Sequence, residues 1–524
     1  MALVVAGTIA ALAAGAEDDV FAGRVWLSDD GTVAAVTRGN DAGPAGFDDA
    51  PVVDAGAAVI YPGLVDLHSH LGYNTLPLWT DPDQKKPYLN HNSWTGEPSY
   101  KPDISWPAWT LAAQAPESLL AYVQVRALAG GTTSIQGWPS MSRPATNHLV
   151  RCVDDDRVGP LADPVRVSAL TLIESDLKLR TTAMNNGAVF IYHCAEGQPG
   201  PQDSVVNEFV DLDKAGCLQQ RMVTIHTNAL GPGNYTRWRT RAREVSTTPP
   251  YGTVVWSPFS NLWLYGVTTD VPSALAAQLT VSIGTDWGPS GTHNQLGEIK
   301  VARLHSDGAG WGLTDADLAQ MVTSIPGDAV ARSWQLPVGR LVPGALADVV
   351  VIDQRKDSPW ASLVAARERD IRLVVANGRP VWGTTAMMKA ARATNTTSVR
   401  LGSVSRRVSL VRPDDPTATW PWRDVLARLN EVRKNAATEP PSGPAGGVGP
   451  PRAKTPSVDP PGTPPIVIDL DMPGGPQTVA GPPPKGQLVD IPPIEAVYHN
   501  QAWLRSIHGK GFHGGALDGL ADLF

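Results

Sequence analysis

The stretch Tyr61-Pro62-Gly63-Leu64-Val65-Asp66-Leu67-His68-Ser69-His70 is an apolar run that ends in two histidines separated by one residue. We interpret it as a buried strand. Side chains at positions i and i+2 of a strand point to the same side, so His68 and His70 can converge on one metal ion while Ser69 faces away. Imidazole is the commonest metal ligand in proteins. A buried strand with two incidental histidines is the alternative interpretation.

Length and charge limit the classes of protein that this chain can represent. Its 524 residues exceed a single ordinary domain but fit one large barrel with an accessory domain. The net charge of −8 is mild and both signs are interspersed, which predicts no nucleic-acid partner. Cys152, Cys194 and Cys217 form no spaced framework, which is typical of a reducing compartment. We therefore expect a cytoplasmic protein.

The first 16 residues are apolar but lack the basic region of a signal peptide. They are also too short to span a membrane, and further short strands follow at once. We expect residues 3–12 to be the first strand of a folded domain and predict no membrane partner. Secretion is the alternative interpretation.

After His70, apolar strands alternate with helical stretches. A Trp-rich loop over about 72–107 comes first, and a helix is predicted over 116–129. The predicted strands that follow cover residues 132–136, 165–170, 188–192, 221–225, 252–256 and 279–283. This alternation predicts a parallel sheet, and so many strands favour a (β/α)₈ TIM barrel. His193, His226 and Asp286 come at or just after strand ends, where barrel enzymes place their chemistry.

The rest of the chain divides around this predicted barrel, which we assign to residues 61–335. Short β-runs over 1–60 and 336–412 predict a small β-sandwich domain built from both flanks. Residues 413–524 comprise an amphipathic helix near 420–434, a Pro/Gly-rich linker over 440–484 and a tail. The tail contains a helical piece over 496–507 that could dock on a neighbouring subunit, so a homo-oligomer stays open. We interpret three tail histidines as surface residues: His499, His508 and His513.

Five motifs in order resemble the signature of the amidohydrolase superfamily. They are Pro62 to His70, His193-Cys194-Ala195-Glu196-Gly197, Ile225-His226, Trp256 to Asn261, and Gly284-Thr285-Asp286. The similarity is greatest to the mononuclear-metal branch, which contains cytosine and guanine deaminases, triazine hydrolases and imidazolonepropionase. It covers about residues 3–385 and leaves the C-terminal part unexplained.

The resemblance implies one divalent ion held by three imidazoles and a carboxylate, with an open position for water. We assign His68, His70, His193 and Asp286 as its ligands. The ion would lower the pKa of the bound water and supply hydroxide near neutrality. Zn²⁺ is the first choice and Fe²⁺ the second, since geometry alone does not separate them.

Three residues are assigned to catalysis. Glu196 follows His193 by three residues, and in this branch that spacing marks the glutamate that carries a proton from water to the leaving nitrogen. An exposed loop carboxylate is the alternative. Asp286 can share the proton traffic, and His226 would stabilise charge on the substrate or, alternatively, bind a second metal. The region 165–175 has no lysine to bridge two ions, although Glu174 could bridge.

Aromatic residues near the strand tips suit a planar organic substrate, although most of the 17 tryptophans are expected to be structural. The candidate substrate contacts are Asn74, Trp138, Asn261, Trp263, Tyr265 and Trp287. We expect hydrolysis of a non-peptide C–N bond in a small molecule, either deamination or opening of a cyclic amide. A non-catalytic barrel scaffold that binds partners through its Pro-rich tail is the alternative.

Overall fold

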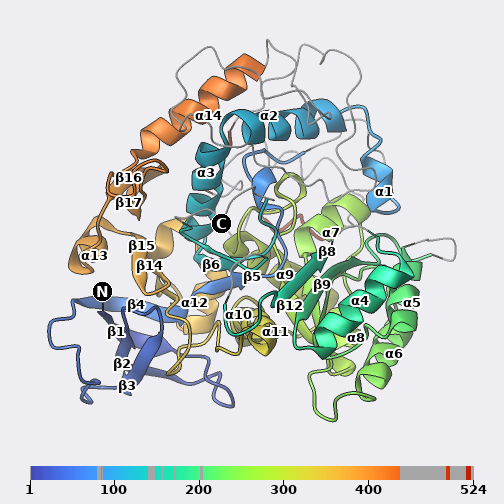
Figure 1. Cartoon of the computed structure of the whole chain (residues 1–524), viewed down its shortest axis with the longest axis horizontal. Coiled ribbons are helices and arrows are strands. Elements are labelled where there is room, and N and C mark those ends of the chain that lie inside the picture. The colour runs from blue at the N-terminus through green and yellow to red at the C-terminus, as the bar shows by residue number, and fades with distance from the viewer. Residues whose placement is uncertain are drawn as a thin grey trace.

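The computed structural model describes residues 2–79, 84, 86–139, 148–154, 158–168, 171–200, 205–436, 491–495 and 515–520 (Figure 1). The predictions for residues 440–484 and 496–507, and for the three tail histidines, lie outside these ranges. Within the described residues, no helix is long and apolar enough to cross a membrane.

Strands from both flanks of the chain join in one nine-stranded sheet with the order β16-β17-β15-β14-β13-β4-β1-β2-β3. The N-terminal flank supplies β1 Leu3–Ala10, β2 Val20–Leu27, β3 Val33–Arg38 and β4 Val52–Pro62. The C-terminal flank supplies β13 Val349–Asp353, β14 Ile371–Ala376, β15 Arg379–Gly383, β16 Thr396–Leu401 and β17 Val404–Ser409. The two flanks meet where β13 pairs antiparallel with β4. The division into a sandwich domain stays a prediction.

Strand β13 shows how this sheet attaches to the rest of the molecule. Val349 and Val351 pack in the core that β1 and β2 share, while Val350 and Ile352 pack in the main core of the chain. Successive side chains of a strand point to opposite faces, so the sheet is covered on both sides at this strand. The run of β-branched residues from Val349 to Ile352 fits this position.

Two parallel sheets lie beside the nine-stranded sheet, with the orders β5-β6-β7 and β12-β11-β10-β9-β8. Their strands are β5 Leu64–Asp66, β6 Thr132–Ile135, β7 Arg151–Cys152, β8 Val165–Ser168, β9 Val189–Cys194, β10 Met222–His226, β11 Thr253–Trp256 and β12 Thr280–Ile283. A parallel bridge between Ser69 and Asp286 brings the end of β5 to the end of β12. The strands of the two sheets together make the eight that a (β/α)₈ barrel needs.

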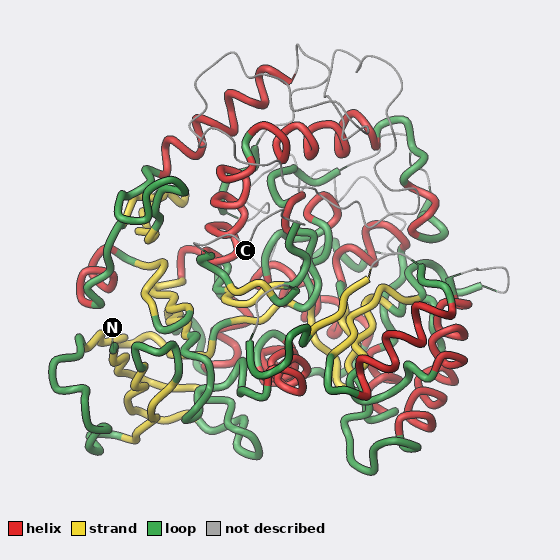
Figure 2. Tube along the Cα trace, in the orientation of Figure 1, coloured by secondary structure: helices red, strands yellow, loops and turns green. Residues whose placement is uncertain are grey.

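Helices connect and cover these strands, as Figure 2 shows by the red tubes outside the yellow strands. They are α3 Pro116–Ala129, α4 Glu174–Asn185, α5 Val206–Ala215, α6 Pro232–Ala242, α7 Pro258–Tyr265, α8 Val271–Ala276, α9 Gln295–Ala309, α10 Asp315–Met321 and α11 Ser324–Trp334. Valines from β9, β10 and β11 form one apolar cluster with Trp334 of α11. Phe190 and Tyr192, at the alternate positions of β9, belong instead to the main core.

The prediction of a continuous loop over 72–107 was wrong. This segment contains α1 His91–Trp94 and a π-helical turn Lys101–Ser105 that runs into α2 Trp106–Gln114. Trp79, Trp94 and Tyr100 bury their rings against one another, with centroids 5.5 to 6.2 Å apart. Tertiary packing of these rings stabilises helices that local periodicity does not predict. Strand β7 was missed because a strand of two residues is too short to show an alternation of apolar and polar side chains.

The amphipathic helix predicted near 420–434 is α14 Trp422–Ala436. It buries Val425, Leu429 and Val432, one face at helical spacing, and packs on α2 and α3. The ring of Trp422 stacks on Tyr122 of α3 with centroids 5.9 Å apart.

Candidate metal centre

Four histidines from three strand ends meet at one edge of the barrel. His68 and His70 follow β5, His193 is the penultimate residue of β9, and His226 ends β10. Their ring centroids are 4.6 Å apart for His68 and His193, 5.0 Å for His68 and His70, and 5.0 Å for His68 and His226. Parallel strands bring their carboxyl ends to the same edge, which explains why residues so distant in sequence come together.

Asp286 lies between the first two of these histidines. Its Oδ1 is 2.9 Å from His68 Nε2 and 3.6 Å from His70 Nε2. Its backbone N–H donates to the carbonyl of His68 at 2.8 Å, and the N–H of Trp287 donates to Oδ1 at 2.6 Å. The surrounding imidazoles hold the pKa of Asp286 well below its usual range although burial opposes this, so the group is a carboxylate.

These side chains fit a divalent metal ion. Among the described residues, two groups have donor atoms within 4.8 Å of one another: His68, His193 and His226, and His68, His70 and Asp286. Nδ1 of His193 is buried with no hydrogen-bond partner, and burial followed by repulsion from His68 lowers the pKa of His193 well below its usual value. A buried neutral imidazole has a lone pair to offer, and three imidazoles with a carboxylate suit Zn²⁺ and similar ions.

The backbone is left-handed at several of these strand ends. φ is +54° at Ala195, +68° at His226 and +59° at Asp286. Residues with a Cβ adopt this region at a cost, and such strain gathers at functional sites. The contacts that surround these residues must therefore offset the energetic cost of the left-handed backbone.

Glu196 faces the histidine cluster from the loop after β9 and is only 6% exposed. Its Oε2 lies 3.7 Å from His226 Nε2, and its Oε1 accepts a 2.5 Å hydrogen bond from the hydroxyl of Tyr265. Burial, and next the charge of Asp286, raise the pKa of Glu196 to about 8. A carboxyl group with a raised pKa can both accept and donate a proton near neutrality.

Tyr265 connects Glu196 to an aromatic cluster. Its hydroxyl accepts a 3.1 Å hydrogen bond from Trp94 Nε1 while it donates to Glu196. Trp94 stacks on Trp287, the residue after Asp286, with centroids 4.9 Å apart and planes at 29°. The order of donors directs the hydroxyl proton of Tyr265 to Glu196.

Asn261 of α7 determines the tautomer of His226. Its Nδ2 lies 3.1 Å from His226 Nδ1, and the Thr269 hydroxyl beside them donates to the backbone carbonyl of His226 at 2.5 Å. Nδ1 of His226 therefore accepts a hydrogen bond, and Nε2 carries the proton toward Glu196. Burial lowers the pKa of His226 to about 3, so the ring is neutral. This arrangement favours a hydrogen-bond donor over a ligand to a second metal ion.

The other candidate substrate contacts have varied surroundings. Trp263 stacks on Phe259 at 5.6 Å and donates from Nε1 to the carbonyl of Trp79. Trp138 packs on His148 with centroids 4.3 Å apart. Asn74 is buried, and its Oδ1 has no hydrogen-bond partner. A substrate-binding role for these residues stays a prediction.

Glu174, the alternative bridge between two ions, lies at the start of α4 with its side chain 64% exposed. It pairs with Lys178 at 2.6 Å, one turn along the same helix. The histidine cluster is buried, so this placement argues against a bridging role.

Sequence reasoning missed His91 and Glu208. His91 Nδ1 is 3.7 Å from Glu196 Oε2, and His91 Nε2 is 3.9 Å from Glu208 Oε1. The other oxygen of Glu208 accepts the backbone N–H of Ala195 at 2.8 Å. Neither residue belongs to a motif, and only the fold brings α1 and α5 to the loop after β9.

Asp66 was also missed, although it lies two residues before His68. It accepts hydrogen bonds from the backbone N–H of His68 at 3.1 Å and from the hydroxyl of Thr285 at 2.6 Å. A buried carboxylate within the motif therefore joins the end of β5 to the loop that carries Asp286. An acidic residue inside an otherwise apolar strand was the available signal.

Comparisons with known proteins agree on one family. Residues 192–381 match the model of the amidohydrolase family. The 5-methylthioadenosine/S-adenosylhomocysteine deaminase of Moorella thermoacetica is 25% identical over 372 residues, which cover 64% of this chain and 84% of that protein.

Solved structures share the fold. An adenosine deaminase from Xanthomonas campestris with bound zinc aligns with a TM-score of 0.55 at 17% identity, over 83% of this chain and 98% of its own. The E. coli guanine deaminase aligns with a TM-score of 0.52 at 16% identity, over 73% and 99%. Part of the chain therefore resembles the amidohydrolase family, and together with the deaminase relatives this indicates a hydrolase that acts on carbon–nitrogen bonds.

Proposed function

We propose that this hydrolase deaminates an amino-substituted heterocycle of the purine class with the help of a single bound Zn²⁺ ion. The observation that carries the proposal is the position of Glu196, which faces the histidine cluster at 3.7 Å from His226 and is held by Tyr265. The names of the curated relatives support deamination over the opening of a cyclic amide. Zinc in the adenosine deaminase structure supports the choice of metal.

His68, His70, His193 and Asp286 would hold the ion. The donor atoms of His68, His70 and Asp286 lie within 4.8 Å of one another, and the ring of His193 lies 4.6 Å from that of His68. A divalent ion bound there supplies a Lewis acid that lowers the pKa of a water molecule toward neutrality. His226 also has a donor atom close to those of His68 and His193, but the hydrogen bond from Asn261 to its Nδ1 favours a different role for that ring.

Glu196 would move the proton. Its carboxylate accepts a proton from water as the water oxygen bonds to the ring carbon that carries the amino group. The same carboxyl group then donates that proton to the amino nitrogen, the C–N bond breaks, and ammonia leaves. The second proton of the water ends on the adjacent ring nitrogen, so the ring carbon becomes a carbonyl. The hydrogen bond from Tyr265 keeps Oε1 in place, so Oε2 is the oxygen that faces His226.

His226 would stabilise the substrate during this step. With Nδ1 engaged by Asn261, its Nε2–H is the donor directed to the reacting group. A fixed donor in a buried site costs no reorganisation when charge develops on the substrate, which is where such groups contribute most to catalysis. A planar heterocycle also suits a site whose neighbouring cluster contains Trp94 and Trp287.

The proposal is tested by incubating the zinc-loaded chain with 5-methylthioadenosine, S-adenosylhomocysteine, adenosine and guanine, and measuring released ammonia. We expect one ammonia per substrate consumed for at least one of these compounds. If the chain instead produces a new carboxylate from a cyclic amide and releases no ammonia, ring opening would replace deamination as the proposed reaction. The alternative of a non-catalytic scaffold does not explain why the metal-binding side chains lie together. Turnover of any compound would exclude it.

A further inference from the structure

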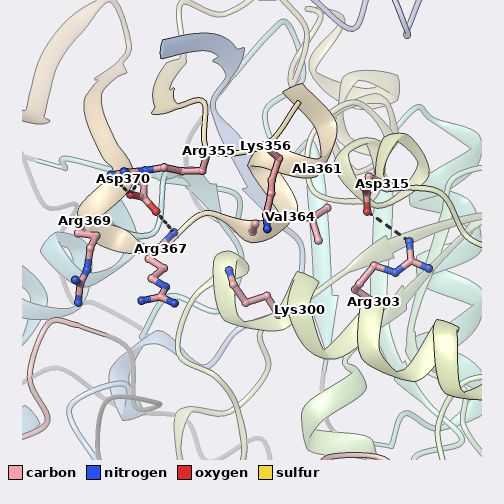
Figure 3. Close-up of a pocket in the computed structure, with 11 residues that line it drawn as sticks. Lys300, Arg303, Asp315, Arg355, Lys356, Ala361, Val364, Arg367, Arg369 and Asp370 are labelled. Carbon is pink, nitrogen blue, oxygen red and sulfur yellow. Dashed lines mark hydrogen bonds and ion pairs between the residues drawn. The ribbon is translucent and has the colours of Figure 1, made fainter. Parts of the chain in front are cut away.

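A cavity of about 670 Å³ lies outside the histidine cluster (Figure 3). Helices α9 and α10 line one side of it. The segment between β13 and β14, which includes α12 Pro359–Ala365 and the 3₁₀ turn Glu368–Asp370, lines the other. Six cationic side chains border the cavity: Lys300, Arg303, Arg355, Lys356, Arg367 and Arg369. Two carboxylates, Asp315 and Asp370, accompany them, so positive charge is in excess in a chain whose net charge is −8.

Only part of this positive charge is neutralised by the protein. Arg303 pairs with Asp307 at 2.5 Å and with Asp315 at 3.5 Å. Arg355 pairs with Asp370 at 2.8 Å and with Asp353 at 3.2 Å. Among the residues that the structure describes, no carboxylate lies within ion-pair distance of Lys356 or Arg367. Desolvated cations are stabilised by anions, so the unpaired cations of the cavity can bind an anionic ligand.

Lys300 brings a buried cation to the same cavity. Its side chain is 1% exposed, and its amine donates to the carbonyl of Leu296 at 2.9 Å and to the carbonyl of Ala366. Burial is the main cause that lowers its pKa to about 7. The charge of Glu368 raises the pKa in part, and the charge of Arg367 lowers it. An anion placed between these two cations would offset both effects.

We propose that this cavity binds a small phosphate-bearing polyanion with at least two charged groups, such as a diphosphate. The guanidinium fork of arginine matches phosphate oxygens in pairs, and lysine adds a compact point charge. A single carboxylate is too small a charge for a site with this many cations. The cavity volume accommodates a diphosphate with an attached organic group.

The bound ligand would join two parts of the molecule. Lys300 and Arg303 belong to α9, which follows the barrel strand β12, whereas Lys356 and Arg367 belong to the segment that leads into β14 of the nine-stranded sheet. A ligand that contacts both sides is bound only by the folded chain, so it should raise the temperature of unfolding with concentration.

The test is calorimetric titration of the full chain with pyrophosphate at low ionic strength. We expect saturable binding of one pyrophosphate per chain, and the double variant Lys356→Ala/Arg367→Ala should weaken it about ten-fold or more. Lys389→Ala/Arg379→Ala is the matched control, because it removes the same two charges from exposed positions outside the cavity. This control should leave the affinity unchanged.

A second variant, Ala361→Glu, places a carboxylate at the lining of the cavity and should also abolish binding. Citrate tests the chemical class of the ligand, and the proposal predicts weaker binding of citrate than of pyrophosphate. Pyrophosphate that does not saturate, equal loss of affinity in the control, or citrate that binds as tightly would each overturn the proposal. None of these variants touches the histidine cluster, so deaminase activity is an independent check of folding.

Discussion

Tyr265 donates a 2.5 Å hydrogen bond to Glu196, although 69 residues separate them in sequence. Trp94, from a third part of the chain, donates to the same hydroxyl and so leaves its proton for Glu196. The orientation of the proposed proton carrier therefore depends on an aromatic network that no single motif contains. The predictions that follow start from this relationship.

Replacing Tyr265 with Phe should lower kcat without loss of metal. The variant removes one hydrogen bond to an ionisable group, worth about 1.5–3 kcal/mol, which corresponds to roughly 10–100-fold in rate. Steady-state ammonia release and metal analysis of the same sample measure the two effects. Tyr251→Phe is the control, since that hydroxyl makes only a 3.4 Å contact with the carbonyl of Thr247. An unchanged kcat in Tyr265→Phe would show that Glu196 does not need this support.

Replacing Glu196 with Gln should leave metal content unchanged and lower kcat by about 10²–10⁴-fold, the usual contribution of a general acid–base group. The amide keeps the shape of the side chain but cannot carry the proton. Glu174→Gln, at an exposed carboxylate paired with Lys178, should turn over at the normal rate. A fully active Glu196→Gln would remove this residue from the mechanism.

Replacing His68 with Ala should remove the metal. His68 belongs to both groups of close donor atoms and contacts Asp286 at 2.9 Å, so its loss breaks both. The metal-to-protein ratio after dialysis measures the effect. His305→Ala should keep a normal ratio, because that ring lies against Trp256 and Trp311. Full metal content in His68→Ala would show that the metal binds at another site.

The histidines and Asp286 could be predicted from the sequence because each sits at the end of an apolar strand. Position at a strand end is a local property, and parallel strands bring such ends together without further information. The ring distances between His68, His193 and His226 are consistent with that reasoning.

The partners of these residues could not be predicted in the same way. His91 and Glu208 approach Glu196 only through the packing of α1 and α5 around the loop after β9. The amide of Asn261 donates to His226, a contact that the sequence did not predict, and its predicted contact with substrate stays a prediction. Such contacts depend on side-chain packing between distant segments, and the hydrophobic periodicity of a sequence does not predict that packing.

Replacing Gly137 with Ala should disturb the metal centre through the backbone. A Cβ built at Gly137 lies 1.4 Å from the carbonyl oxygen of Ser69, the residue between His68 and His70. The loop would have to move, and metal affinity should fall. Gly46→Ala is the matched control, because Gly46 has a similar φ of +88° but nothing within 4 Å of its Cβ. Metal titration of both variants should separate steric displacement from backbone strain, and equal affinities would contradict the account.

The buried amine of Lys300 predicts a pH dependence of stability. Its pKa is lowered from 10.5 to about 7, so the unfolded chain binds more protons between these values and the folded chain gains stability as pH rises. A single such group contributes about 1.4 kcal/mol per pH unit within that window. Lys300→Met should lose this contribution. Unfolding of both proteins at pH 7.5 and 9.5 tests it, and identical pH slopes would show that Lys300 does not titrate there.

The most direct test of the account is ammonia release by one preparation of the full chain before chelation, after chelation and after addition of one equivalent of Zn²⁺. The account predicts activity that disappears when the metal is removed and returns in proportion to the zinc that is bound. A chelated, metal-free protein that releases ammonia at the original rate would contradict it.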